Sequence, residues 1–378
     1  MVLMEKQMQE GLLPHPARVE VSLGQLRSNI YELRKLIGKS LYCLPLKANA
    51  YGHGLCKIGL EAQKAGVDYL AVAHVNEGVS LRKAGVLLPI LVLGAFCLED
   101  VAPVSDYKLE LTIASSYQAK WLEKRLNGKK CRVHLKVDTG MRRLGVLPRE
   151  AKTLFSYLEN SGSFDVVGIY SHFARANNAG DSFTEKQIAS FKRLRSDPVF
   201  MKKKLIWHIC NSGGTLFFPQ AHFDMVRPGL FTFGCLPRHC EKKLLKVAPC
   251  LSLKAQVAHS KIVSKGCGVS YEHSFVTLKK SRIVTIPIGY GDGFLRFLSN
   301  KGKVLLQNRF CPIVGNICMD QFMVDAGALR VEMGEEAVLI GRQGGLEISA
   351  REIADSLGTI PYEVLCLLNE RIPRIYTD

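Results

Sequence analysis

The sequence lacks several patterns that mark special classes of protein. Its 378 residues contain no run of about 18 apolar residues, so no membrane-spanning helix is expected. The first twenty residues carry early acidic side chains and no apolar run followed by a small-residue cleavage site, which is not typical of a signal peptide. We therefore expect a cytoplasmic protein with no membrane partner.

Cysteine motifs are also absent. The twelve cysteines are scattered without any C-x-x-C, and several, such as Cys43, Cys97 and Cys210, lie in apolar segments, which favours reduced thiols over a disulfide framework. In "CLPRHC", Cys235, His239 and Cys240 offer three ligand types but no fourth nearby, so we expect no metal site.

Acidic residues are few beside basic ones. There are 34 Asp and Glu against 51 Lys and Arg, a formal net charge of +17. Such an excess can indicate nucleic-acid binding. Here the basic residues lie in separate segments such as "RKLIGK" and "KRLNGKK", and no basic stripe is interleaved with aromatic residues. We expect a solvated basic surface that favours anionic ligands, and no nucleic-acid partner.

What the chain does have is a regular alternation of apolar runs and helix-like stretches between residues 40 and 235. The β-branched-rich runs number eight: "YCLPL", "YLAVAHV", "PILVLGAF", "LELTIA", "CRVHLKV", "VVGIYSHF", "LIWHIC" and "MVRPGLFTF". Strands that alternate with helices form parallel sheets, and eight units at this spacing favour an α/β fold with a closed (β/α)8, TIM-like barrel. An open, doubly wound sheet remains an alternative count of the same runs.

The spacing of the apolar runs changes after about residue 245. Closely spaced strand-like runs such as "SRIVTIPIGY", "QFMVDA" and "EAVLIG", separated by Gly-, Asn- and Lys-rich turns, predict a mostly antiparallel β domain. One helix is expected at "SAREIADSLG", capped by Ser349 and ended by Gly358. An earlier helix, "SFTEKQIASFKRL", has Ser182 or Thr184 as candidate N-cap. We expect domains at 14–243 and 244–378, with 1–13 a candidate segment to pack on the second.

Polar residues follow the ends of the predicted barrel strands, where such barrels carry their chemistry. They are Lys47, Lys136, Asp138, His172, Asn211, Ser212, Arg227 and Gly229. The loops after the seventh and eighth strands are common phosphate sites, and "NSGG" and "RPGL" offer a hydroxyl and accessible amides there. A phosphate site opposite the amine of Lys47, in "PLKANAYGHG", suits pyridoxal 5'-phosphate, whose aldehyde forms a Schiff base with lysine.

Motifs spread in order over nearly the whole chain resemble the alanine racemase family. They are "LKANAYGHG", "LKVDTGMRRLG", "YSHFA", "HICNSGG", "VRPGL", "VSYE", "IPIGYGDG", "NICMDQ", "PYEVLC" and "RIPRIY". The resemblance implies a pyridoxal-phosphate barrel followed by a β domain, active as a homodimer with sites shared between subunits. It also implies an isomerase that interconverts L- and D-alanine through an external aldimine and supplies D-alanine for peptidoglycan.

The resemblance also implies a role for each matching residue. Lys47 would be the Schiff-base lysine and one base, and Tyr271 of the partner subunit the other. The phosphate would be held by Tyr51, Ser212, Gly229, Leu230 and Tyr362, with Asn211 in the same cofactor site. Arg227 would contact the pyridine nitrogen with support from His172. Arg143 would orient the substrate, braced by Lys136, which is often carbamylated in the family. Cys318, Met319 and Tyr290 would line the substrate side.

These residue types suit racemisation, which removes the Cα proton from one face and returns a proton on the other. Lysine and tyrosine ordinarily titrate near pH 10, so each needs a cationic surrounding to act as a base near neutrality. An arginine at the pyridine nitrogen cannot readily give up its proton, so that nitrogen should stay unprotonated. The chain departs from the family where glycine is usual: Arg142 precedes Arg143, and Glu272 follows Tyr271.

The sequence also allows other functional interpretations. A broad-specificity racemase for serine, lysine or arginine would use the same chemistry in a wider pocket. Basic-amino-acid decarboxylases share the two-domain plan, but their glycine-run phosphate loop and late Cys-Asp pair are not evident here. A pyridoxal-phosphate carrier protein would be a lone barrel without the last 130-odd residues.

Overall fold

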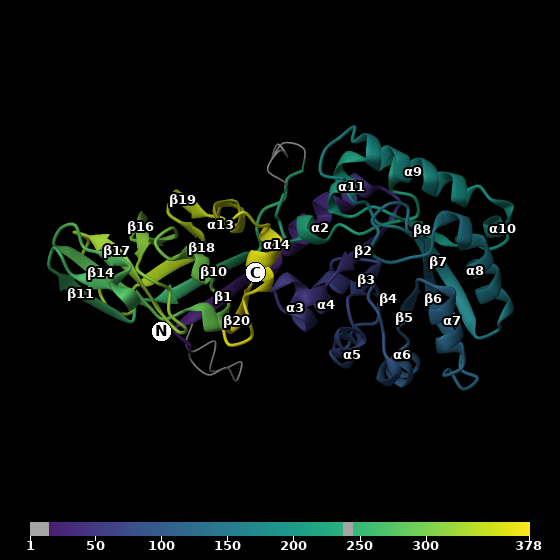
Figure 1. The fold of residues 1–378 in the computed structure, drawn as a ribbon, viewed down its shortest axis with the longest axis horizontal. Coiled ribbons are helices and arrows are strands. Elements are labelled where there is room, and N and C mark those ends of the chain that lie inside the picture. The colour runs from purple at the N-terminus through teal and green to yellow at the C-terminus, as the bar shows by residue number, and fades with distance from the viewer. Residues whose placement is uncertain (1–14, 237–244) are drawn as a thin grey trace. The chain divides into compact units, whose positions relative to one another are not determined.

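The computed structural model describes residues 15–236 and 245–378 and divides into two compact units (Figure 1). Among the described residues, one unit comprises 26–50, 54–236 and 245–248, and the other comprises 15–25, 51–53 and 249–378. Of the expected features, residues 1–13, His239 and Cys240 lie outside the described residues. Within the described part of the chain, no helix is long and apolar enough to cross a membrane.

The first unit is a closed barrel of eight parallel strands, as predicted, in the order of the sequence (Figure 1). The strands are β2 (Leu41–Pro45), β3 (Tyr69–Val72), β4 (Ile90–Val92), β5 (Glu110–Ile113), β6 (Cys131–Lys136), β7 (Phe164–Tyr170), β8 (Ile206–His208) and β9 (Met225–Val226). β9 pairs in parallel with β2 and closes the ring. All eight apolar runs of the sequence therefore became barrel strands.

Helices surround the strands because each connection between parallel strands must cross over. They are α2 (Leu23–Ile37), α4 (Leu55–Lys64), α5 (Val75–Lys83), α6 (Val101–Asp106), α7 (Ser116–Glu123), α8 (Pro148–Asn160), α9 (Ser182–Arg195), α10 (Pro198–Met201), α11 (Ser212–Phe217) and α12 (Gly229–Thr232). The N-cap expected for α9 was wrong. Asp181 caps it, because its carboxylate accepts from the Thr184 amide at 2.8 Å.

The second unit is built on a ten-stranded sheet. Its path is β11 (His259–Val263), β14 (Ser281–Ile286), β17 (Phe322–Gly327), β16 (Arg309–Val314), β15 (Lys303–Leu306), β18 (Glu336–Gln343), β10 (Leu251–Gln256), β1 (Ala17–Ser22) and β20 (Arg374–Thr377), with β19 (Leu346–Ile348) beside β18. β12 (Gly268–Val269) and β13 (Phe275–Val276) form a separate hairpin. Only β1 and β20 pair in parallel in this unit's described strands, which confirms the mostly antiparallel prediction.

Two short helices complete the second unit. α13 (Ala350–Leu357) begins where Ser349 accepts from the Glu352 amide and ends at Gly358 in the left-handed conformation, both as predicted. α14 (Pro361–Cys366) starts with proline, whose missing amide hydrogen costs nothing in a first turn.

Candidate active site

Lys47 begins a left-handed turn. It opens α3 (Lys47–Tyr51), in which Ala48, Asn49, Ala50 and Tyr51 all have φ of 53–54°. For residues other than glycine, this conformation costs roughly 1–2 kcal/mol of conformational free energy per residue. Fixed contacts hold the turn: Glu77 Oε1 accepts from the Ala48 amide at 2.8 Å, and Asn49 Oδ1 accepts from the Leu55 amide at 2.7 Å. The strained turn therefore sets the direction in which Lys47 leaves its strand.

The expected cofactor residues of the barrel unit do gather at the carboxyl ends of its strands. Lys136 ends β6, His172 follows β7, Asn211 follows β8, and Arg227 follows β9. Parallel strands of a closed barrel bring these ends to one face. Ser212 and Gly229 are the first residues of the short helices α11 and α12 at the same face.

Arg227 is almost wholly buried, with 3% of its surface exposed. Its Nη1 donates to His208 Nδ1 at 2.6 Å, and its Nη2 donates to the Ser171 carbonyl at 2.8 Å and to His172 Nδ1 at 3.2 Å. A guanidinium has only donors, so both imidazoles must accept at Nδ1. Burial, reinforced by the Arg227 charge, also holds the pKa of His172 and of His208 well below the usual range. Both histidines are therefore neutral.

Three buried residues of the barrel interior escaped the sequence analysis: Glu110, His134 and His208. His208 Nε2 lies 3.1 Å from His134 Nδ1, and His134 Nε2 lies 2.9 Å from Glu110 Oε2. Glu110 begins β5 and His134 lies within β6. The available signal was a charged or imidazole side chain within the apolar runs "LELTIA", "CRVHLKV" and "LIWHIC".

Lys136 is 4% exposed, and its Nζ has no hydrogen-bond partner among the described residues. The amine lies over the ring of Tyr170, 4.4 Å from the centroid. Burial, followed by the charges of Arg227 and Arg143, holds the Lys136 pKa well below its usual value, while Asp138 opposes the shift. These surroundings therefore favour the uncharged amine, which is the nucleophilic form.

The second unit holds Tyr51 beside Tyr362. Their ring centroids are 5.6 Å apart with the planes tilted by 58°. The next residue, Gly52, has no room for a side chain, because an added Cβ would lie 2.2 Å from the Leu365 carbonyl oxygen of α14. Two of the five residues expected to hold phosphate are thus brought together.

The second unit also gathers Tyr271 with Cys318, Met319 and Tyr290, three of the four residues expected to bind substrate, whereas Arg143 belongs to the barrel unit. The Asn316 side chain donates to the Tyr271 carbonyl at 3.1 Å, and Asn316 leads directly to Cys318 and Met319. The amides of Tyr290 and Gly291 donate to the carbonyls of Cys318 and Met319 at 3.1 and 2.8 Å.

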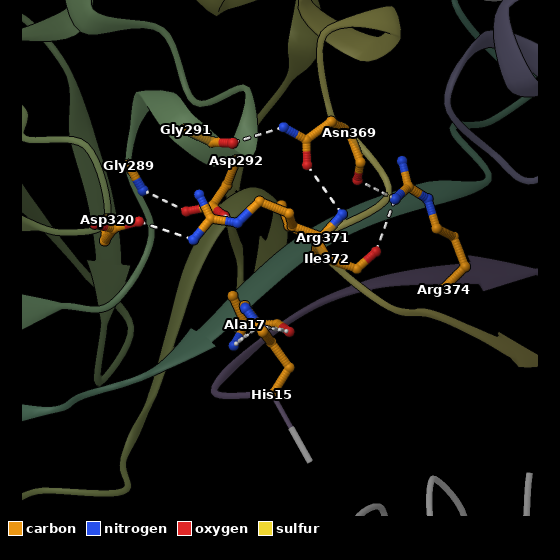
Figure 2. Close-up of polar contacts among 10 residues, drawn as sticks. All are labelled: His15, Ala17, Gly289, Gly291, Asp292, Asp320, Asn369, Arg371, Ile372 and Arg374. Carbon is orange, nitrogen blue, oxygen red and sulfur yellow. Dashed lines mark hydrogen bonds and ion pairs between the residues drawn. The ribbon is translucent and has the colours of Figure 1, made fainter. Parts of the chain in front are cut away.

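Arg371 ties the same two loops together (Figure 2). Its Nη2 lies 2.8 Å from Asp320 Oδ1, next to Met319, and its Nε lies 3.3 Å from Asp292 Oδ1, two residues after Tyr290. Asn369 supports the arrangement by donating to the Gly291 carbonyl at 2.7 Å. The C-terminal segment therefore fixes the loops that carry Tyr290 and Met319.

No described side chains form a metal site. Residues 15–236 and 245–378 contain no group of three or more His, Cys, Asp or Glu placed to hold an ion. Cys235 is described, but its two companions in "CLPRHC" are not.

Comparison with known proteins accounts for both units. Residues 21–237 match the model of the alanine racemase N-terminal domain, and 250–376 match that of the C-terminal domain. The chain is 39% identical to the alanine racemase of Treponema denticola over 95% of this chain and 97% of that protein. It is also 39% identical to that of Symbiobacterium thermophilum over 96% and 97%.

Solved structures agree with the sequence comparison. Alanine racemase of Clostridium difficile 630 superposes with a TM-score of 0.91 at 35% identity, covering 97% of this chain and 96% of that one. The Bacillus anthracis alanine racemase with bound L-Ala-P also gives 0.91, at 34% identity and the same coverage. The chain therefore belongs to the alanine racemase family of pyridoxal-phosphate-dependent amino-acid isomerases.

Proposed function

We propose that this chain binds pyridoxal 5'-phosphate at Lys47 and interconverts L- and D-alanine. The observation that carries the proposal is the buried Arg227, which meets two neutral histidines at the barrel face where Lys47 leaves its strand. A donor cluster of this kind suits the unprotonated nitrogen of a pyridine ring. A carboxylate there would instead hold a proton on that nitrogen.

The residues proposed for the phosphate also fit such a group. Asn211 accepts from the Gly214 amide at 3.0 Å and so fixes the start of α11, where Ser212 offers its hydroxyl. An added Cβ at Gly213 would lie 2.2 Å from the Ala176 carbonyl oxygen, so this loop must lie close to its neighbour. The Gly229 amide already donates to the Arg227 carbonyl at 3.0 Å, so we propose the Ser212 hydroxyl and the Leu230 amide as the main phosphate donors of this face.

The chain's own groups would carry the proton transfers. The cofactor, when bound, would supply an electron-withdrawing group that makes the Cα hydrogen of the amino acid more acidic. Lys47 would exchange the proton on one face of that carbon, and Tyr271 of a second copy would exchange it on the other. Arg143 would orient the substrate carboxylate. Its charge lowers the pKa of Lys136, which supports their proximity.

The second copy is part of the proposal. Three large side chains proposed for the site are well exposed in the single chain: Tyr271 at 71%, Tyr290 at 44% and Met319 at 54%. Exposed apolar side chains that lie together often mark an interaction surface. We propose a homodimer in which each copy completes the other's site. We also propose a cytoplasmic enzyme supplying D-alanine for peptidoglycan, and the eleven described cysteines, all free thiols, suit that reducing compartment.

The test is a spectrum followed by an assay. Purified protein loaded with pyridoxal phosphate should show a visible absorbance that borohydride abolishes, and it should form D-alanine from L-alanine. Lys47→Ala should lose both, whereas Lys64→Ala, an exposed lysine of α4, should keep both. Retention of the reducible absorbance by Lys47→Ala would exclude the lysine assignment. Faster turnover of serine, lysine or arginine than of alanine would favour the broad-specificity alternative.

A further inference from the structure

A chain of buried polar side chains runs through the barrel interior, and the proposed reaction uses only one end of it. We call Glu110, His134, His208 and Arg227 the Glu110 relay. Their exposed fractions are 2%, 0%, 0% and 3%. Glu110 is the first residue of β5, and Arg227 follows the last residue of β9, so the relay connects the amino-end side of the barrel with its carboxyl-end face.

Hydrogen-bond chemistry fixes every proton in the relay. Arg227 can only donate, so His208 Nδ1 accepts at 2.6 Å and the proton of this neutral ring is on Nε2. That Nε2–H faces His134 Nδ1 at 3.1 Å, which must therefore accept. The remaining His134 proton is on Nε2 and is donated to Glu110 Oε2 at 2.9 Å. All the donors point from Arg227 towards Glu110.

Glu110 is suited to be the final acceptor. Its other oxygen, Oε1, faces two donors, Arg132 Nη2 at 2.9 Å and the Tyr69 hydroxyl at 3.5 Å. A buried carboxylate is costly unless donors surround it, and three donors surround this one. An acceptor at this position leaves the His134 ring only one proton arrangement.

The barrel also makes room for the contact between the two histidines. β7 lies between β6 and β8, and its residue beside them is Gly168. An added Cβ there would lie 2.6 Å from His134 Nδ1, the atom that accepts from His208. Tyr170 of β7 then stacks on the His208 ring, with centroids 4.8 Å apart and planes 1° apart. The glycine therefore allows the relay to pass across an intervening strand.

We propose that Glu110 and His134 are positioning residues for the reaction. By fixing the His208 proton on Nε2, they present His208 Nδ1 as a permanent acceptor for Arg227, and this acceptor orients the guanidinium towards the cofactor ring. The catalytic consequence rests on the function proposed above. The order of the protons does not, because it follows from contacts within the barrel alone.

The direct test is nitrogen-15 NMR of ring-labelled histidine in the full-length protein loaded with pyridoxal phosphate, at neutral pH. His134→Gln and His208→Gln variants assign the two rings. Both rings should be neutral and protonated on Nε2 only. A proton on Nδ1 of either ring, or on both nitrogens of one ring, would overturn the proposal. This readout holds even if the protein racemises no alanine, so the two proposals fail separately.

Variants then test the link to turnover. Glu110→Leu removes the final acceptor, so the His134 ring should become a mixture of tautomers. By analogy with groups that orient metal-bound histidines, kcat should fall roughly 10-fold, with little change in KM. Glu110→Gln keeps an accepting oxygen, so the His134 ring should stay protonated on Nε2 and most of kcat should be retained. If the leucine variant does not fold, the glutamine variant is measured in its place, and a His134 ring protonated on Nδ1 would contradict the proposal. Glu159→Gln, a partly exposed carboxylate of α8, is the control. Full kcat in a folded Glu110→Leu enzyme would overturn the assignment.

Discussion

Glu77 accepts a hydrogen bond from the Ala48 amide at 2.8 Å, one residue after the proposed cofactor lysine. The other oxygen of Glu77 accepts from the amides of Ala73 and His74 at 2.8 and 3.1 Å. One carboxylate thus connects the left-handed turn of α3 to the start of α5. This link explains how a turn that is unfavourable in isolation is held in place.

Removing this carboxylate should loosen the lysine turn. Glu77→Ala leaves three amides without their acceptor, so we expect the free energy of unfolding to fall by about 1–3 kcal/mol. The activity should fall further than stability alone explains, because the direction of Lys47 is no longer fixed. Urea unfolding and alanine turnover at a temperature where the variant is folded measure the two effects. Lys83→Ala, exposed on the same helix, should change neither; equal effects in both variants would contradict this account.

Lys136 should make stability depend on pH. Its pKa is lowered by folding, so the unfolded chain binds more protons than the folded one below the usual lysine pKa. Its contribution is therefore unfavourable near neutrality and disappears as the pH rises towards about 10.5. In carbonate-free buffer, Lys136→Met should exceed the unsubstituted protein in stability at pH 7, by a margin that narrows with rising pH.

The control for this measurement is Lys124→Met, which replaces an exposed lysine after α7. Its stability difference should not vary with pH. If added bicarbonate closes the gap between the Lys136→Met variant and the unsubstituted protein, the neutral amine is reacting to form a carbamate. A gap that widens towards alkaline pH would show that Lys136 is charged in the folded protein.

Glu272 lies beside the proposed second base in a left-handed conformation, with φ of 61°. Glycine adopts this conformation freely, so Glu272→Gly should stabilise the protein by about 1 kcal/mol. Glu272→Ala removes the same carboxylate but keeps a Cβ, and it should give no such gain. Thermal unfolding of the two variants separates backbone strain from charge. Equal stability of the two variants would contradict the strain explanation.

Arg371 should stabilise the protein mainly through its ion pair with Asp292, which is 2% exposed. Its pair with the largely exposed Asp320 should contribute less. Arg371→Met leaves the buried carboxylate without its cation, so the free energy of unfolding should fall by about 1–3 kcal/mol. KM for alanine should also rise, because the loops of Tyr290 and Met319 lose their common anchor. Asp320→Asn breaks only the exposed pair and should cost less than about 1 kcal/mol. The reverse order of effects would exclude Asp292 as the critical partner.

The barrel could be predicted because the residues that define each strand lie next to one another in the sequence. Each strand is an apolar run, and each expected polar residue at its end, such as Lys47 or His172, is adjacent to that run in sequence. The same holds for α13, whose cap and stop residues flank it. The N-cap of α9 was missed for a local reason: Asp181, one residue before Ser182 and three before Thr184, offers a charged acceptor in place of a hydroxyl.

The Glu110 relay could not be predicted, because it depends on which strand residues point into the barrel and across Gly168. His134 and His208 are 74 residues apart, and the strand between them must carry a glycine at the right register. The pairing of β1 with β10 and β20 is similarly remote in sequence. Local patterns carry neither kind of information.

The central claim is that two bases, Lys47 and Tyr271 of a second copy, act on opposite faces of the amino acid. The most direct measurement is exchange of the Cα hydrogen for deuterium, followed separately from L- and D-alanine in deuterium oxide with Tyr271→Phe. The account predicts that this variant exchanges the hydrogen of one enantiomer and no longer that of the other, with racemisation lost. Exchange from both enantiomers at equal rates would contradict it.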